Sequence, residues 1–314
     1  MEFSERFSRQ LRRFSESELE LSPPQVYPPP LELMKSHLWF GGSSDTKPTI
    51  DRTTPIGSMG SCFARRIKEW LELNGFNYVQ AGSTAGGMPH GSADWERVFN
   101  TYCVVQEISR LVDGIELPLR ELPDGRVVDP WRKNKIFDNW CSAEENLEAY
   151  LEGGIQVLKE MSVFVITLGL SEVWFDRESE LAFAEFPKFR DAFPLDSLRV
   201  QFADAATNLR NLDRAVRMLR TVNPRLQVVL TVSPVPLRAT FFERSVLASN
   251  SLSKSSLLQA AIELSASTEN VHYFPAYEIA LLLNEGPTFE WDGRHVNDDT
   301  VALIMKHFEQ AFVV

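Results

Sequence analysis

The sequence is poor in the residues that most covalent and metal chemistry requires, with three Cys and five His among 314 residues. Cys62, Cys103 and Cys141 are widely spaced and form no Cys-x-x-Cys pair. An odd number of such cysteines is typical neither of a disulfide framework nor of a thiolate zinc site. No carboxylate and histidine cluster has metal-ligand spacing, and no phosphate-binding or dinucleotide-binding glycine motif is present. We therefore expect no metal and no cofactor.

Positive charge is also scarce, because 32 Lys and Arg residues stand against 43 Asp and Glu, which gives a net charge of −11. This excess of negative charge excludes nucleic acid as an expected partner and favours a neutral substrate over a polyanion. No stretch approaches the roughly 20 consecutive apolar residues of a membrane-spanning helix. The N-terminus lacks the apolar core of a signal peptide. The expectation is a cytoplasmic protein without a membrane span.

The apolar residues, 44% of the chain, fall into short runs separated by amphipathic segments. We expect strands at residues 53–59, 76–80, 162–168, 225–232 and 271–274. Helices are expected at residues 62–74, 95–112, 143–161, within 195–221, at 254–267 and at 298–312. Buried strands that alternate with helices predict an α/β fold with a mainly parallel sheet covered on both faces.

Residues 1–50 differ from the rest of the chain and are predicted to form an N-terminal arm. Five prolines between Ser22 and Pro30 exclude a helix there and predict an extended strap. The arm is a candidate for binding a protein partner or a second copy of the chain. Residues 51–314 are predicted to form one domain, with an irregular or hairpin insertion at about 113–142 and a long Gly/Ser-rich loop at 81–95.

Ligands of parallel sheets bind at the carboxyl ends of the strands, so the residues after each strand are the candidate site. Gly60-Ser61-Cys62 stands where the first strand turns into a helix, whose N-terminus favours a thiolate or an oxyanion. Asp292 precedes His295 by three residues, so it can orient the imidazole through Nδ1 and leave Nε2 free to take a proton. Each pattern alone also has a purely structural interpretation, as a helix cap or a solvated loop.

Five segments in this order resemble the GSCFA family, which is placed among the SGNH or GDSL-like hydrolases. The matching segments are GSCFARRI at 60–67, VITLGLSEVW at 165–174, TVSPVP at 231–236, NSLSKSSL at 250–257 and DGRHVN at 292–297. The resemblance covers about residues 50–310. It implies a three-layer α/β/α flavodoxin-like (SGNH hydrolase) fold, a nucleophile after the first strand, and Asp292 and His295 as its catalytic partners.

Two residues compete for the role of nucleophile. In the wider group the nucleophile stands two residues after the glycine of a Gly-Asp-Ser motif, and this spacing selects Cys62. Matching by residue type selects Ser61 instead. A serine hydroxyl needs His295 as its base, whereas a cysteine at a helix N-terminus beside an imidazole can be partly ionised, so both remain candidates.

An oxyanion hole is also required, and the resemblance indicates where its donors lie. The wider group uses the backbone N–H of the nucleophile, a glycine of a second block and an asparagine of a Gly-x-Asn-Asp block. Here Ser171 occupies the asparagine position and Glu172 the aspartate position, and Asn100 is the candidate to replace the missing amide. The candidate residues for the oxyanion hole and for substrate contacts are Gly60, Asn100, Gly169, Ser171 and Glu172.

The sequence thus predicts an acyl-ester hydrolase or O-acyltransferase that forms a covalent acyl-enzyme. The resemblance implies an acylated, for example acetylated, carbohydrate or sugar-containing metabolite as substrate. The alternative is a non-catalytic carbohydrate-binding or scaffold protein on the same fold, which the altered Gly-x-Asn-Asp block favours.

Overall fold

The computed structural model describes residues 48–81, 91–95, 97–132, 135–284 and 286–314. A parallel sheet of four strands lies at its centre, in the order β1-β5-β9-β10. The strands are β1 (Ile56–Gly60), β5 (Val163–Leu168), β9 (Gln227–Val232) and β10 (Val271–Phe274). The prediction of a parallel sheet is confirmed, whereas the predicted N-terminal arm lies almost entirely outside the described residues.

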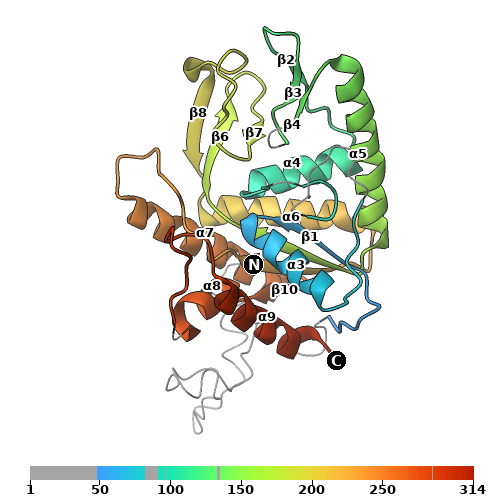
Figure 1. Cartoon of the computed structure of the whole chain (residues 1–314), viewed down its shortest axis with the longest axis vertical. Helices are drawn as coiled ribbons and strands as arrows, with labels where there is room; N and C mark the ends of the chain where they lie inside the picture. Colours follow the sequence, from blue (N-terminus) through green and yellow to red (C-terminus); the bar gives the residue numbers. More distant parts are fainter. Residues whose placement is uncertain (1–47, 82–90, 96, 133–134, 285) are drawn as a thin grey trace.

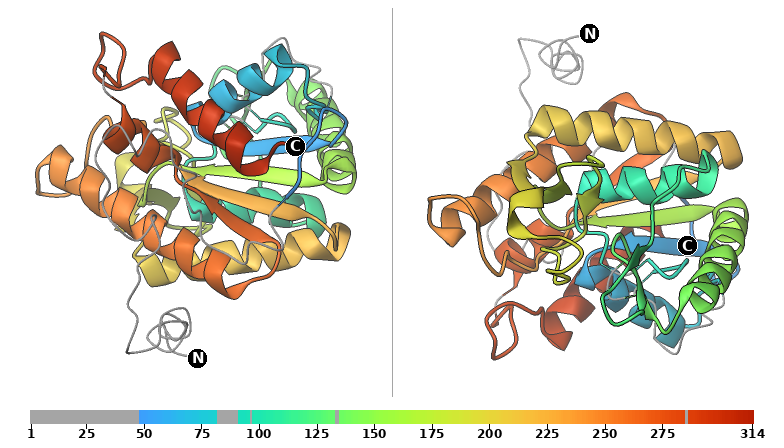
Figure 2. Two further views of the ribbon diagram at one scale, coloured as in Figure 1. Left: turned by 90° about the horizontal axis from the view of Figure 1, so that it is seen from below. Right: turned by 90° about the horizontal axis from the view of Figure 1, so that it is seen from above.

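Helices cover both faces of this sheet (Figures 1 and 2). The helical segments are α3 (Cys62–Leu73), α4 (Thr101–Val112), α5 (Trp140–Glu160), α6 (Ala205–Val222), α7 (Val246–Ser267), α8 (Ala276–Glu278), the π-helix η3 (Ile279–Leu283) and α9 (Asp298–Phe312). Helices α3 and α9 pack on one face, and α4 to α7 pack on the other. This arrangement is the predicted three-layer α/β/α fold.

The side chains of β5 show how the two faces are specified. Val163 and Val165 belong to the apolar cluster that contains Phe63 of α3 and Phe308 of α9. Phe164, Ile166 and Leu168 belong to the cluster on the other face, because successive side chains of a strand point to opposite sides. All six residues of β5 are buried, as expected for the middle of a parallel sheet.

Two small antiparallel sheets lie at one end of the domain (Figure 1). One is formed by β2 (Arg120–Glu121), β3 (Val127–Asp129) and β4 (Lys135–Phe137), within the predicted insertion. The other, not expected from the sequence, has the order β7-β6-β8. Its strands are β6 (Glu172–Asp176), β7 (Ala182–Phe183) and β8 (Leu198–Phe202), and the short 3-10 helix η2 (Leu195–Ser197) leads into β8.

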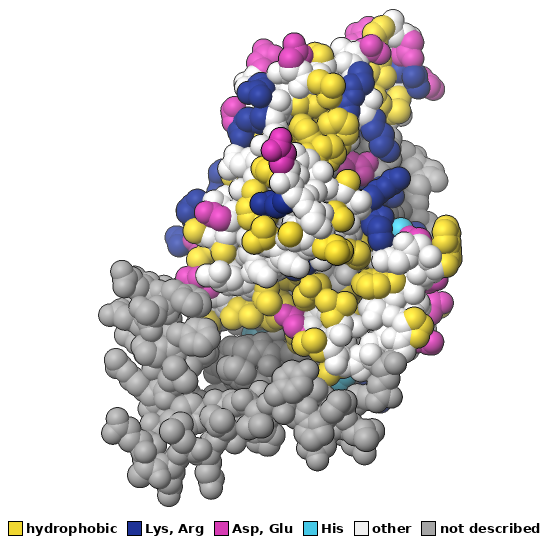
Figure 3. All heavy atoms as spheres, turned by 90° about the vertical axis from the view of Figure 1, so that its left-hand side faces the viewer, with side chains coloured by type: hydrophobic (Ala, Val, Ile, Leu, Met, Phe, Trp, Pro, Cys, Tyr) yellow, Lys and Arg dark blue, Asp and Glu magenta, His cyan; other side chains and the backbone are white. Residues whose placement is uncertain are grey.

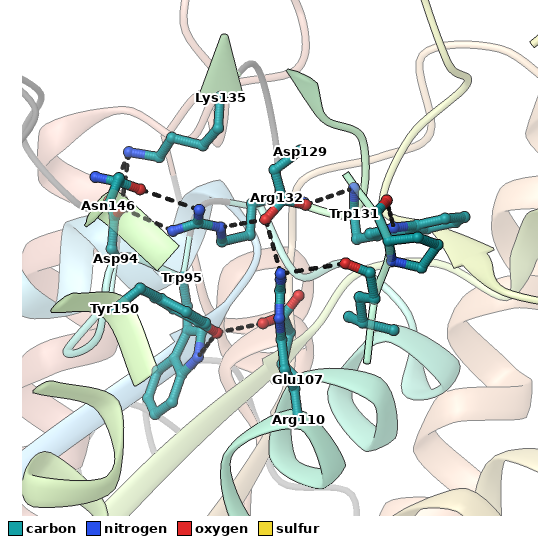
Figure 4. A network of polar contacts seen from close by, with 12 residues as sticks. Asp94, Trp95, Glu107, Arg110, Asp129, Trp131, Arg132, Lys135, Asn146 and Tyr150 are labelled. Atoms are coloured by element: carbon teal, nitrogen blue, oxygen red, sulfur yellow. Dashed lines mark hydrogen bonds and ion pairs between the residues drawn. The ribbon is translucent and has the colours of Figure 1, made fainter. Parts of the chain in front are cut away.

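A buried network of charged side chains joins the β2–β4 sheet to the helical layer (Figure 4). Asp129 of β3 accepts hydrogen bonds from Arg110 Nη2 of α4 at 3.0 Å and from Arg132 Nε at 2.7 Å. Tyr150 of α5 donates to Glu107 of α4. Burial raises the pKa of Glu107. These hydrogen bonds attach the insertion to the helical layer.

Three predicted elements differ from the structure. The helix predicted at 254–267 begins at Val246, where Ser245 caps it. Residues 76–80 do not form a strand, because the segment pairs with β1 only at the single bridge between Ile56 and Tyr78 before it turns away. The helix predicted from residue 95 begins at Thr101, because Arg97 adopts a left-handed φ of 55° and Asn100 caps the helix. Residues 82–90 of the predicted loop lie outside the described residues.

Candidate active site

The turn between β1 and α3 requires a glycine. Gly60 has φ +136°, and a Cβ at this position would lie 2.2 Å from the carbonyl oxygen of Thr167 on the neighbouring strand. Ser61 then caps α3, because its Oγ accepts the N–H of Phe63 at 3.2 Å. The Ser61 N–H donates to Thr167 Oγ1 at 2.8 Å, and its Oγ lies 3.0 Å from the same atom. The Ser61 hydroxyl therefore already has hydrogen-bond partners within the protein, the Phe63 N–H and Thr167 Oγ1.

Cys62 is the first residue of α3 and lies differently from its neighbour. It is half-buried, and its thiol makes no hydrogen bond with the described residues. Its backbone N–H belongs to the first turn of the helix, where amides have no intrahelical acceptor. The helix N-terminus favours negative charge at this point. An oxyanion beside the Cys62 N–H would be stabilised here.

The loop before α9 holds the predicted Asp and His together. His295 Nδ1 and Asp292 Oδ2 are 2.5 Å apart, and Asp292 Oδ1 accepts the N–H groups of Arg294 and His295 at 2.9 Å each. The backbone donors, followed by the imidazole, lower the pKa of Asp292 to about 2. Gly293 supplies the left-handed φ of +68° that this tight turn needs. With Nδ1 directed at a carboxylate, the imidazole presents Nε2 to its surroundings.

A cavity of about 450 Å³ brings the two segments together. Ser61, Cys62 and His295 line it, although they are separated by more than two hundred residues of sequence. Among the described residues, His295 Nε2 makes no hydrogen bond to Ser61 Oγ or Cys62 Sγ. Catalytic hydrogen bonds are often long before substrate binds and tighten in the complex. The predicted nucleophiles and the predicted base therefore share one cavity without a hydrogen bond between them.

Only two of the five candidates for the oxyanion hole and substrate contacts line the cavity. Gly169 and Glu172 line the cavity. Gly60 shapes the turn beside it, and the Gly169 N–H already donates to the Phe99 carbonyl at 2.8 Å. Asn100 and Ser171 are buried and do not line the cavity.

Asn100 and Ser171 make hydrogen bonds inside the domain instead. Asn100 accepts the Cys103 N–H at 2.9 Å and donates to the Phe183 carbonyl at 3.3 Å. The Ser171 hydroxyl accepts from Asn208 Nδ2 at 3.1 Å and lies 3.4 Å from the Ser253 carbonyl. Their assignment to an oxyanion hole stays a prediction, since these polar groups already have partners in the protein.

Lys254 of α7 has a role at the site that the sequence did not define. Its Nζ is fully buried and donates to the carbonyl oxygens of Gly169, Ser233 and Val235 at 2.7, 2.7 and 2.8 Å. Three acceptors require the three donors of an ammonium group. Burial opposes that charge and lowers the pKa of Lys254 to about 7. The side chain ties together the loops after β5 and β9, which form part of the cavity wall.

The unexpected β6–β8 sheet supplies an aromatic wall. Trp174 of β6 lies edge-on to Phe186 and to Phe241, with ring centroids 4.8 Å apart in both pairs, and Phe186 stacks on Phe241 at 5.2 Å. All three residues line the cavity. Figure 3 shows the face formed by this sheet and the loop after β9, where Lys and Arg side chains flank a band of hydrophobic side chains. Trp174 and Phe186 belong to an aromatic-rich stretch of the sequence at 174–193, whereas Phe241 lies in the loop after β9 and joins them only in the folded chain.

The part of the chain that the structure describes contains no group of three or more His, Cys, Asp or Glu side chains placed to hold a metal ion. Within the same residues, no helix is both long and apolar enough to cross a membrane.

Comparisons with known proteins complete the description of the site. No curated protein has a significantly similar sequence. Among solved structures, the chain is similar to a carbohydrate esterase family 3 from Talaromyces cellulolyticus, with 11% identity, a TM-score of 0.36, and coverage of 82% of this chain and 95% of that one. It is also similar to a Clostridium thermocellum family 3 carbohydrate esterase, with 10% identity, a TM-score of 0.34, and coverage of 82% of this chain and 94% of that one. The model of the GSCFA family matches residues 55–308, and the chain therefore belongs to that family, as its five motifs predict.

Proposed function

We propose that this protein is an acyl-ester hydrolase or O-acyltransferase that works through a covalent acyl-enzyme, with Cys62 as nucleophile and His295 as general base. The observation that carries the proposal is the shared cavity. It is lined both by a thiol at a helix N-terminus and by an imidazole whose other nitrogen is held by Asp292.

The choice of Cys62 over Ser61 is supported by their different surroundings. Ser61 is 3% exposed, caps α3 and contacts Thr167, so its use as a nucleophile would break the cap. Cys62 is more exposed, and its thiol makes no hydrogen bond with the described residues. A thiol at a helix N-terminus is also the more easily ionised of the two groups.

In the proposed reaction, Cys62 Sγ attacks the carbonyl carbon of the ester while its proton moves to His295 Nε2. The bond from the carbonyl carbon to the alcohol oxygen then breaks, and His295 returns the proton to that oxygen. Water or a second alcohol attacks the resulting thioester, with its proton passing through His295 to Sγ. Water gives a hydrolase and an alcohol gives a transferase. The Cys62 N–H is the first donor we assign to the oxyanion.

We propose an acylated carbohydrate or sugar-containing metabolite as the substrate. The aromatic wall supports this class, because the apolar face of a sugar ring packs on aromatic side chains. A cavity of about 450 Å³ has the size of a small-molecule site. We also place the protein in the cytoplasm, a proposal supported by its three free cysteines.

Trapping the acyl-enzyme tests the proposal. The protein is mixed with p-nitrophenyl acetate, with and without a sugar acceptor, and the acylated residue is located by mass spectrometry. We expect acylation of Cys62 and loss of both acylation and turnover in Cys62→Ala. Cys141→Ala removes an exposed thiol outside the cavity and should change neither result. Ser61→Ala should keep the acylation of Cys62 while losing about 1 kcal/mol of stability with the helix cap.

The outcomes separate the alternatives. Acylation of Ser61, or full activity of Cys62→Ala, would transfer the role of nucleophile to the serine. The rival function, a non-catalytic carbohydrate-binding or scaffold protein, is favoured by the missing contact between His295 and either nucleophile. Sugar binding without an acyl-enzyme, and without labelling of Cys62 by iodoacetamide, would support it.

A further inference from the structure

The cavity has a local excess of positive charge, although the chain as a whole has a net charge of −11. Four cationic side chains line it against two carboxylates, leaving His295 aside. The cationic residues are Arg97, Lys188, Arg238 and Arg294, and the carboxylates are Glu172 and Glu185. The charge that a ligand would meet depends on which of these groups are already paired with other groups of the protein.

Glu172 is turned toward the protein. Its carboxylate accepts the hydroxyl of Thr240 at 2.6 Å and the N–H of Phe241 at 3.2 Å. Arg244, which does not line the cavity, lies 3.9 Å from it. Glu172 is only 7% exposed, so its charge is met by groups of the loop after β9 rather than by a ligand.

Glu185 is shared between two of the cations. Its oxygens lie 3.5 Å from Arg97 Nη1 and 3.9 Å from Lys188 Nζ. Arg97 Nε is nevertheless buried without a hydrogen-bond partner among the described residues. Arg97 also has the left-handed φ of 55°, a conformation that costs energy for a residue other than glycine and is found most often at functional sites.

Arg294 and Arg238 have no carboxylate partner among the described residues. Arg294 stands next to His295, and its Nη2 donates to the Pro236 carbonyl at 3.3 Å. Its Nε is buried and unpaired within the described part of the chain. Arg238 is exposed and makes no hydrogen bond or ion pair with any described residue. Both guanidinium groups line the cavity without a carboxylate partner among the described residues, so an anion in the cavity would supply the counter-charge.

The same cavity contains the aromatic wall of Trp174, Phe186 and Phe241, beside the nucleophile and the base. A ligand that contacts both the aromatic wall and the arginines needs an apolar ring face and a negatively charged group. A monosaccharide derivative has the size to carry both. We infer that the substrate is a small acylated sugar that bears an anionic group, a phosphate or a carboxylate, which binds Arg294 and Arg238. The position of the acyl group on this ligand rests on the proposed function, whereas the binding of the anion does not.

A binding measurement tests the inference without requiring turnover. The Cys62→Ala protein is titrated by calorimetry with glucose 6-phosphate, glucuronate and glucose, at low and at high salt. We expect at least one of the two anionic sugars to bind about tenfold more tightly than glucose, with a preference that weakens as salt is added. The stronger of the two identifies the anionic group.

Charge variants supply the controls. Arg294→Gln and Arg238→Gln should each reduce the preference for the anionic sugar, and Arg238 is exposed, so its replacement does not threaten the loop of His295. Arg217→Gln removes the same charge from the surface of α6 and should leave the preference intact. Equal binding of all three sugars, no binding of any, or an unchanged preference in both cavity variants would overturn the inference. Anion preference without an acyl-enzyme would refute the proposed function alone.

Discussion

The two polar clusters of this protein use the same residue types in opposite ways. In the buried network of Figure 4, Arg110 and Arg132 share the carboxylate of Asp129, and Glu107 is bonded to Tyr150. In the cavity, Arg294 has only a carbonyl partner, and the thiol of Cys62 has none among the described residues.

The difference shows where polar groups are used for structure and where they remain available. A buried ion pair loses several kcal/mol when one partner is removed, because the other charge is left unpaired. Groups at an open cavity can be replaced at little cost to the fold, since water reaches them. The network should therefore respond to mutation through stability, and the cavity through activity.

Replacing His295 should give the largest effect. His295→Gln removes the base but keeps a polar side chain, and we expect the rate of ester turnover to fall by about 10³-fold or more. The melting temperature should change little, because the His295 side chain is 53% exposed. Parallel rate and calorimetric measurements check both expectations. A large drop in melting temperature would show that the cavity loop supports the fold, contrary to the comparison above.

Replacing Asp129 should give the opposite pattern. Asp129→Asn keeps the shape of the side chain but removes the carboxylate that Arg110 and Arg132 share, and Asp94, 3.9 Å from Arg132 Nη1, is a weaker partner. We therefore expect a loss of about 3 kcal/mol in the free energy of unfolding. Urea denaturation measures this loss. Asp213→Asn, which breaks an exposed pair with Arg217, is the matched control and should cost less than about 1 kcal/mol. Equal losses in the two variants would remove the distinction between buried and exposed pairs.

A third prediction concerns a buried histidine outside the cavity. His272 on β10 is buried with Gln227 as partner and no carboxylate, and burial lowers its pKa to about 4. Between pH 6.5 and 4 the unfolded chain binds a proton that the folded chain does not, so the free energy of unfolding falls as the pH is lowered through this window. We expect His272 to account for roughly 2 kcal/mol of that fall.

Urea denaturation at neutral and at acid pH, in the wild type and in His272→Gln, measures the contribution of this residue. The variant can still donate to Gln227 but does not titrate, so its stability should depend less on pH. An identical slope in both proteins would assign the pH dependence to other groups.

The sequence predicted the parts of the fold that depend on local pattern. Apolar runs such as 163–168 predicted the parallel sheet. Asp292 and His295 were predicted as a pair because an Asp three residues before a His can reach its imidazole within one turn of the chain. The β6–β8 sheet was missed because β7 has only two residues and because β6 pairs with β8 across the intervening segment, which no local pattern encodes.

The same limit applies to the site. Thr167 and Lys254 contact the turn and the cavity loops from distant elements, and neither contact follows from sequence spacing. The expectation of a neutral substrate came from the net charge, which is a sum over the whole chain and does not report the local excess of arginine beside His295. Residues that meet only in the folded chain set the chemistry of this cavity.

The five residues that give the family its name divide their work unequally. Gly60 lets the backbone approach the neighbouring strand closely, Ser61 caps the helix, and Phe63 and Ala64 are fully buried. A related chain that kept these four and exchanged Cys62 for alanine would build the same turn and remain recognisable as a relative. Recognition of this motif therefore reports a way of folding, and in the reaction we propose Cys62 is the one residue of the five whose side chain takes part.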